Sequence, residues 1–204
     1  MSTLGVVLAG GSSSRFGTDK AAAILGGRTM LQLVCERVAP QVDRLAVNRS
    51  AASTPGLRGD YMYLTDDWPG EGPLAGILAA LEYARANGFE YMASFPCDAP
   101  FFPAGLVMRL REQLILSKAD YCVAKSGDYE HHAFALWNAG CAPAIRALFL
   151  AGTRGIRELS STLTKTAADF PVAGEGFIAD AFLNINTPGD FALAESWLAS
   201  HRMK

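Results

Sequence analysis

The feature that most constrains the fold is the alternation of short apolar runs with longer segments of helical periodicity. Residues 4–9 form a continuous, partly β-branched apolar run that stops at a Gly-Gly pair, which indicates a buried strand. Residues 29–39 carry apolar side chains at helical spacing and open with Thr29, a favourable N-cap, so they predict an amphipathic helix. Repetition of this order predicts an α/β fold, with a mostly parallel sheet and helices on both faces.

The same patterns extend over the whole chain. Further strands are expected at 45–47, 61–64, 90–95, 121–124, 132–137, 166–172 and 182–185, and further helices at 74–86, 103–117, 142–151, 155–162 and 189–200. The region 120–175 alternates less regularly, which predicts an antiparallel excursion. With 204 residues, no internal repeat and no low-complexity linker, we expect one domain, 1–204.

Composition excludes several classes of function. The net charge is −2, the pI is about 5.9 and there is no block of Lys or Arg, so nucleic acid is not an expected partner. No segment approaches the roughly 18 apolar residues of a membrane helix, and the first residues lack a signal peptide's basic start. The four cysteines form neither a CxxC pair nor a zinc spacing, which predicts reduced thiols and a cytoplasmic protein.

The strongest functional motif follows the first predicted strand, where open α/β sheets bind their ligands. Residues 8–20 read LAGGSSSRFGTDK. Gly10 and Gly11 allow close backbone approach, and consecutive amides there can cradle phosphate oxygens. Arg15 and Lys20 supply cations for phosphate. The segment fits neither the Walker A pattern nor the GxGxxG fingerprint, so phosphate recognition must rest on this loop's own arrangement.

Polar residues at the ends of other predicted strands form the second signal. Asp98, in the segment FPCDAP, could hold Mg²⁺ together with substrate phosphates, or simply cap the turn between its two prolines. The other candidates are the Asp66-Asp67 pair before GEGPLAG, Asn48 after the second strand, and Asn184 and Asn186 in NINTP. For these asparagines a turn or N-cap role is an equally good interpretation.

Five motifs in this order resemble the molybdenum cofactor guanylyltransferase family. They are the glycine loop, the Val47-Asn48 step, GPLAG at 72–76, PCDAP at 96–100 and NINTP at 184–188. The glycine loop alone would indicate only a nucleotidyltransferase of the wider sugar-nucleotide type. The resemblance covers residues 4 to about 198.

The resemblance implies a Rossmann-like, three-layer α/β/α nucleotidyltransferase fold with Mg²⁺ as cofactor. It also implies transfer of GMP from GTP to the terminal phosphate of molybdenum-molybdopterin, with release of pyrophosphate. Molybdoenzymes or their chaperones are implied as recipients of the product. The implied roles are nucleotide binding by Leu8, Ala9, Gly10 and Gly11, phosphate binding by Arg15 and Lys20, guanosine contacts by Asn48 and Asp66, Mg²⁺ and GTP binding by Asp98, and metal or second-substrate contacts by Asn184 and Asn186.

The sequence departs from the family pattern after the polar turn at 126–128. His131 keeps the family's histidine, whereas His132 stands where proline is usual, on the side assigned to the pterin. Adjacent strand residues point to opposite faces, so the two rings are not expected to share a metal ion. Asp67 remains an alternative to Asp66. Cys97 is interpreted as a small buried residue rather than a nucleophile.

Two other functions remain open from the sequence. One is a cytidylyltransferase acting on the molybdenum cofactor, or a sugar-phosphate nucleotidyltransferase. The Gly10-Gly11 pair favours guanine, because those relatives resemble LAAG at this position. The other is a nucleotide-binding regulator without turnover, which the combination of Arg15, Lys20 and Asp98 disfavours. Trp68 and Trp137 are expected in packing rather than in stacking on a ligand.

Overall fold

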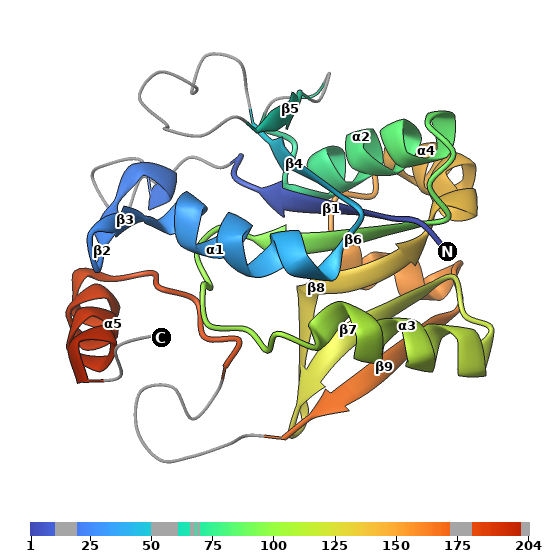
Figure 1. Cartoon of the computed structure of the whole chain (residues 1–204). Helices are drawn as coiled ribbons and strands as arrows, with labels where there is room; N and C mark the ends of the chain where they lie inside the picture. Colours follow the sequence, from blue (N-terminus) through green and yellow to red (C-terminus); the bar gives the residue numbers. More distant parts are fainter. Residues whose placement is uncertain (11–19, 50–60, 66–67, 69, 172–180, 201–204) are drawn as a thin grey trace.

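The computed structural model describes residues 1–10, 20–49, 61–65, 68, 70–171 and 181–200. Seven strands form one sheet in the order β5-β4-β1-β6-β8-β7-β9 (Figure 1). They are β1 (Thr3–Leu8), β4 (Arg44–Asn48), β5 (Met62–Leu64), β6 (Tyr91–Pro96), β7 (Tyr121–Ser126), β8 (Tyr129–Asn138) and β9 (Lys165–Phe170). β8 runs antiparallel to β6 and β7, and the other pairs are parallel. The mostly parallel sheet and its antiparallel excursion are therefore confirmed.

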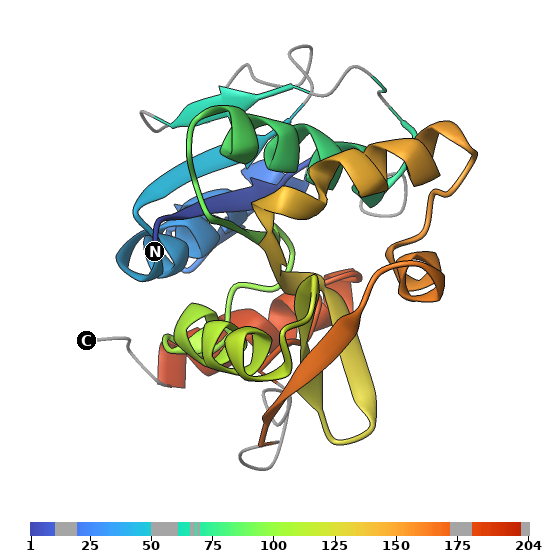
Figure 2. The ribbon, with the colours of Figure 1, turned by 90° about the vertical axis from the view of Figure 1, so that its right-hand side faces the viewer.

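Helices cover both faces of this sheet and complete three layers. They are α1 (Met30–Val38), α2 (Pro73–Ala86), α3 (Leu106–Ser117), α4 (Ala142–Leu150) and α5 (Pro188–Ser200), with short 3-10 turns η1 (Lys20–Ala22), η2 (Ala39–Gln41), η4 (Ala139–Cys141) and η5 (Ile156–Ser161). Residues of α2 and α4 share one buried cluster, and those of α1 and α3 share another. Figure 2 shows these pairs on opposite sides of the strands. The predicted α/β/α architecture is confirmed.

The alternation of side chains along β1 shows how the two cores form. Leu4 and Val6 enter the cluster under α2, whereas Val7 enters the cluster under α1. A Cβ at Gly5 would lie 2.9 Å from Val38 and Val42 side-chain atoms, so glycine lets α1 approach this strand closely. Both faces of the strand are buried, as its continuous apolar run predicts.

The predicted start of α1 is confirmed in detail. The Thr29 hydroxyl accepts the Gln32 amide at 3.1 Å, and the Gln32 side chain accepts the Thr29 amide at 2.9 Å. This reciprocal pair is a capping box, which satisfies backbone donors that the helix itself leaves open.

A small hairpin before α1 was not predicted from the sequence. β2 (Ile24–Leu25) and β3 (Arg28–Thr29) are joined by Gly26 and Gly27, whose φ angles are +59° and +86°. Two consecutive positive φ values suit a tight hairpin turn, and glycine adopts them without strain. Leu25 packs with Ile185 and residues of α5 in a third, smaller buried cluster.

Three predicted elements differ in the structure. No strand forms at 182–185: Phe182 and Ile185 are buried in different clusters, so their apolar spacing reflects burial without a strand ladder. The segment 155–162 contains the 3-10 turn η5 instead of an α-helix. The helix expected from 103 begins at Leu106, and its N-cap residue is Gly105. Among the described residues, no helix combines the length and apolar character needed to cross a membrane.

Candidate active site

The carboxyl ends of three neighbouring strands place the predicted nucleotide residues side by side. Leu8, the last residue of β1, is in register with Asn48 of β4 and with Pro96 of β6. The Ala9 amide donates to the Asn48 carbonyl at 2.9 Å, and the Cys97 amide donates to the Leu8 carbonyl at 3.2 Å. The register therefore brings the start of the glycine loop, Asn48 and the segment leading to Asp98 to one edge of the sheet.

A cation, a carboxylate and an amide meet at this edge. Lys20 Nζ lies 3.4 Å from Asp98 Oδ2 and donates to Asn186 Oδ1 at 2.7 Å. The Lys20 and Asp98 side chains keep only 17% and 21% of their surface exposed. These residues come from η1, from the turn after β6 and from the segment before α5, so distant parts of the chain build one cluster. The structure therefore brings together three of the predicted site residues: Lys20, Asp98 and Asn186.

The donor set at this cluster fits a small hard cation. Asp98 offers a carboxylate, and the contact with Lys20 uses only part of its acceptor capacity. The described residues contain no group of three or more His, Cys, Asp or Glu side chains arranged to enclose a metal. One carboxylate completed by water and substrate phosphates is how Mg²⁺ is usually bound, whereas Zn²⁺ prefers several nitrogen or sulfur ligands.

Asn48 is held tightly between β5 and α2. Its side-chain amide donates to the Leu64 carbonyl at 3.2 Å, and the residue is only 3% exposed. A Cβ at Gly76, in the first turns of α2, would lie 2.3 Å from Asn48 Oδ1. A Cβ at Gly10 would lie 3.7 Å from the same oxygen. The second glycine of GPLAG thus makes room for the Asn48 side chain, which lies beside Gly10.

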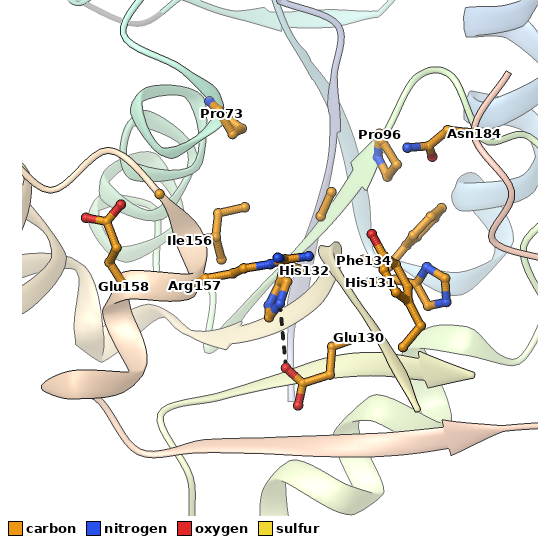
Figure 3. Close-up of a pocket in the computed structure, with 13 residues that line it drawn as sticks. Pro73, Pro96, Glu130, His131, His132, Phe134, Ile156, Arg157, Glu158 and Asn184 are labelled. Carbon is orange, nitrogen blue, oxygen red and sulfur yellow. Dashed lines mark ion pairs between the residues drawn. The ribbon is translucent and has the colours of Figure 1, made fainter. Parts of the chain in front are cut away.

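A cavity of about 410 Å³ opens beside Pro96 and Asn184 (Figure 3). Its lining residues come from five regions of the chain: Pro73, Pro96, 129–134, 155–158 and Asn184. In β8, residues 132–134 stand out of the ladder with β7, because Val123 pairs with Ala135 and Ala124 pairs with His131. This irregularity turns part of β8 toward the cavity, next to the end of β6.

The two histidines of β8 have different surroundings. His131 lies within hydrogen-bond distance of the Ser126 hydroxyl, at 2.6 Å, and stacks on Phe182 at 4.5 Å between ring centroids. His132 Nε2 lies 3.6 Å from a Glu130 oxygen. Burial lowers the pKa of His132, the carboxylate of Glu130 raises it, and the cations of Arg157 and Lys165 lower it further. The net decrease favours a neutral His132 ring at neutral pH.

Arg157 is the cavity residue that the sequence reasoning missed. Figure 3 shows its side chain extending from η5 toward His132. Two other arginines, Arg146 and Arg154, form surface ion pairs with Glu82 and Glu71. Nothing in the local sequence separates Arg157 from these two, because its position depends on η5 packing beside the irregular part of β8.

Four of the predicted residues lie outside the part of the chain that the structure describes: Gly11, Arg15, Asp66 and the alternative Asp67. Asn184 lines the cavity. Trp137 is fully buried and stacks on Tyr121, and Trp68 packs against Phe149, so the expected packing roles are confirmed. Cys97 is partly buried against the core under α1.

Comparisons with known proteins agree with this geometry. A MobA-like NTP transferase domain matches residues 5–170. A molybdenum cofactor guanylyltransferase of Sinorhizobium fredii is 43% identical over 198 residues, which cover 95% of this chain and 90% of the relative. One of Rhizobium meliloti is 39% identical over 201 residues, with 95% and 90% covered. The solved molybdopterin-guanine dinucleotide biosynthesis protein A of Archaeoglobus fulgidus superposes with a TM-score of 0.77 at 25% identity, over 97% of this chain and 99% of that one.

The fold, the strand-end cluster and the matched domain define the chain as an α/β nucleotidyltransferase. Its identities with curated relatives over nearly the whole length place it more closely. The chain belongs to the molybdenum cofactor guanylyltransferase family.

Proposed function

We propose that this protein transfers GMP from GTP to the terminal phosphate of molybdenum-molybdopterin, with release of pyrophosphate. The observation that carries the proposal is the Lys20–Asp98–Asn186 cluster, in which Asp98 and Asn186 each lie two residues along the chain from a cavity-lining residue, Pro96 and Asn184. A nucleotide held by the loop and an acceptor held in the cavity would meet at this cluster. One nucleotidyltransferase domain, 1–204, would perform the reaction in the cytoplasm.

The residues of the loop and the strand ends would bind and orient GTP. The nucleotide would be bound by backbone groups of Leu8, Ala9, Gly10 and Gly11. The guanosine would be contacted by Asn48 and Asp66. Lys20 and Arg15 would neutralise phosphate charge, which grows on the transferring and leaving groups in the transition state. The partly buried position of Lys20 strengthens its field, because solvent screens it less than a surface lysine.

Asp98 would hold Mg²⁺ on the phosphates of GTP. The side-chain oxygen of Asn186 or Asn184 would serve as a neighbouring metal ligand. When bound, the metal ion supplies charge neutralisation and a template for the phosphate oxygens. The chain needs no dedicated general base, because a phosphate nucleophile is already ionised at neutral pH. The protein's task is therefore to place two anionic substrates in line and to offset their repulsion.

The cavity would hold the pterin acceptor. Asn184 lies at its edge near Pro96, and the Arg157 side chain reaches in from η5 toward His132 (Figure 3). Arg157 supplies a cation suited to the acceptor's phosphate, and the neutral His132 ring supplies a hydrogen-bonding group without added charge. The volume of about 410 Å³ falls in the range of small-ligand pockets.

Pyrophosphate release tests the proposal. The purified protein with GTP, Mg²⁺ and molybdenum-loaded pterin should release pyrophosphate, and omission of any of the three should stop it. Asp98→Ala should abolish release while the circular dichroism spectrum stays unchanged. Asp169→Ala is the matched control, since Asp169 pairs with Lys125 at 3.6 Å on the surface of β9. Pyrophosphate release by Asp98→Ala at the rate of the control would remove Asp98 from the site.

A further inference from the structure

Asp190, in the first turn of α5, makes one more contact than the start of a helix requires. Its Oδ2 accepts the Thr187 amide at 2.8 Å, and the Thr187 hydroxyl accepts the Asp190 amide at 3.1 Å. This reciprocal pair alone forms a capping box. The same Oδ2 also accepts the amide of Asn186, at 2.9 Å, which lies outside the helix.

The extra hydrogen bond connects the helix start to the candidate active site. Asp190 accepts the backbone amide of Asn186. The side-chain oxygen of Asn186 in turn accepts a hydrogen bond from the Lys20 ammonium at 2.7 Å. Lys20 in turn lies 3.4 Å from Asp98. A short chain of polar contacts therefore runs from Asp190 through Asn186 and Lys20 to Asp98.

The segment around Asn186 is fixed on its other side as well. The Ile185 amide donates to the Asp98 carbonyl at 2.7 Å, and the Ile185 side chain is buried in the cluster that α5 forms with the β2–β3 hairpin. Ile185 anchors the position of this segment, and Asp190 sets the direction of the next peptide. The Asn186 side chain is exposed, and these two contacts restrict it before substrate binds, so less conformational entropy is lost on binding.

We propose that Asp190 is a positioning residue, which orients Asn186 so that its side-chain oxygen holds the Lys20 ammonium beside Asp98. The consequence for transfer rests on the proposed function, in which Lys20 neutralises GTP phosphates. Burial raises the pKa of Asp190, but the amides of Asn186 and Thr187, the Thr187 hydroxyl and the charge of Lys20 lower it to a net decrease. Asp190 is therefore ionised at neutral pH and accepts these amides as a carboxylate.

Two variants separate positioning from simple capping. Asp190→Ala removes both the cap and the acceptor of the Asn186 amide, whereas Thr187→Ala removes only the threonine half of the cap. Asp120→Ala is a matched control at the opposite end of the sheet. The Asp120 carboxylate accepts the amide and the hydroxyl of Thr164, at 2.8 and 2.7 Å, before β7. Asp190→Asn keeps an acceptor oxygen, so its Lys20 labelling ratio and its kcat/KM for GTP should lie closer to the wild-type values than those of Asp190→Ala.

The first readout requires no substrate. Acetylation of Lys20 by a water-soluble amine reagent is followed by mass spectrometry, with the exposed Lys118 of the same chain as reference. Asp190→Ala should raise the rate at Lys20 relative to Lys118 by about 2- to 10-fold, the factor that one hydrogen bond contributes. Thr187→Ala and Asp120→Ala should leave the ratio at the wild-type value. Equal ratios in Asp190→Ala and Thr187→Ala would overturn the proposal.

The second readout is kinetic. Asp190→Ala should lower kcat/KM for GTP by about 10- to 100-fold, as the loss of supporting contacts typically does, with kcat/KM for the acceptor reduced through the same kcat. Thr187→Ala removes one capping hydrogen bond, so it should lower the urea midpoint no further than Asp190→Ala does and should keep nearly wild-type turnover. A raised labelling ratio in Asp190→Ala, together with a wild-type protein that transfers no GMP, would overturn the proposed function while Asp190's role stands. If the Lys20/Lys118 labelling ratio of Asp190→Ala equals that of the wild type, and the wild-type protein transfers GMP, only the role of Asp190 is overturned.

Discussion

Replacement of Gly76 by alanine tests whether α2 and Asn48 are fitted to each other. The new Cβ would lie 2.3 Å from Asn48 Oδ1, closer than any van der Waals contact allows, so the Asn48 side chain must move. Such overpacking costs about 1–3 kcal/mol. Loss of the Asn48 hydrogen bond to the Leu64 carbonyl adds about 0.5–1.5 kcal/mol. The higher helix propensity of alanine relative to glycine offsets up to about 1 kcal/mol of this loss of stability.

The balance is a decrease of about 1–3 kcal/mol in the free energy of unfolding, measured by urea denaturation. Gly189→Ala is the matched control, because Gly189 lies in the first turn of α5 and its Cβ would have only an ordinary contact, 3.6 Å from Thr187. That variant should be as stable as the wild type or slightly more so. The Gly76→Ala protein should also bind GTP more weakly, since Asn48 lies beside Gly10 and is a proposed guanosine contact.

A double-mutant cycle identifies the cause of the loss. Asn48→Ala removes the side chain that the new methyl group meets, so the double variant should be less destabilised than the sum of the two single changes. Additive losses, or a Gly76→Ala protein with wild-type stability, would refute the reasoning that the two residues are fitted to each other.

Titration of His132, the buried hydroxyl of Ser94 and the metal role of Asp98 can each be tested separately. The pKa of His132 is lowered from 6.5, so below about pH 6.5 the unfolded chain takes up a proton that the folded chain resists. Stability should therefore fall as the pH decreases from there toward the folded pKa, and His132→Gln should flatten this part of a urea-midpoint profile. Ser94→Ala should cost about 1–3 kcal/mol in urea denaturation, because it leaves the buried Trp137 Nε1, now bonded to Ser94 at 3.1 Å, without that acceptor. A chelator should weaken GTP binding in calorimetry and Mg²⁺ should restore it; GTP affinity that is unaffected by the chelator would contradict the metal role of Asp98.

The architecture was largely predictable because local patterns and global packing agree. The apolar run at 4–9 is buried on both faces in β1, and Thr29 caps the helix that its spacing predicts. The strand predicted at 182–185 was wrong, because burial of Phe182 and Ile185 in two different clusters gives the same apolar spacing as a strand. Only the tertiary contacts show that no ladder forms there. The β2–β3 hairpin was missed because its strands are too short to show a period.

The candidate site was predictable in part from strand ends and in part from motif order. Asp98 follows β6, whereas Lys20 in η1 and Asn186 before α5 were predicted by the order of the family's motifs, and the structure joins the three. Arg157 and Asp190 lacked such a signal. The first depends on the packing of η5 beside β8, and the second on a hydrogen bond to a residue four positions away.

The choice of nucleotide tests the central claim most directly. With molybdenum-loaded pterin and Mg²⁺ in excess, kcat/KM for pyrophosphate release is measured separately with GTP, CTP and ATP, and the product is identified by mass spectrometry. Guanylyl transfer predicts a guanine dinucleotide product and a clear preference for GTP. Equal or faster release with CTP, accompanied by a cytosine dinucleotide, would contradict it.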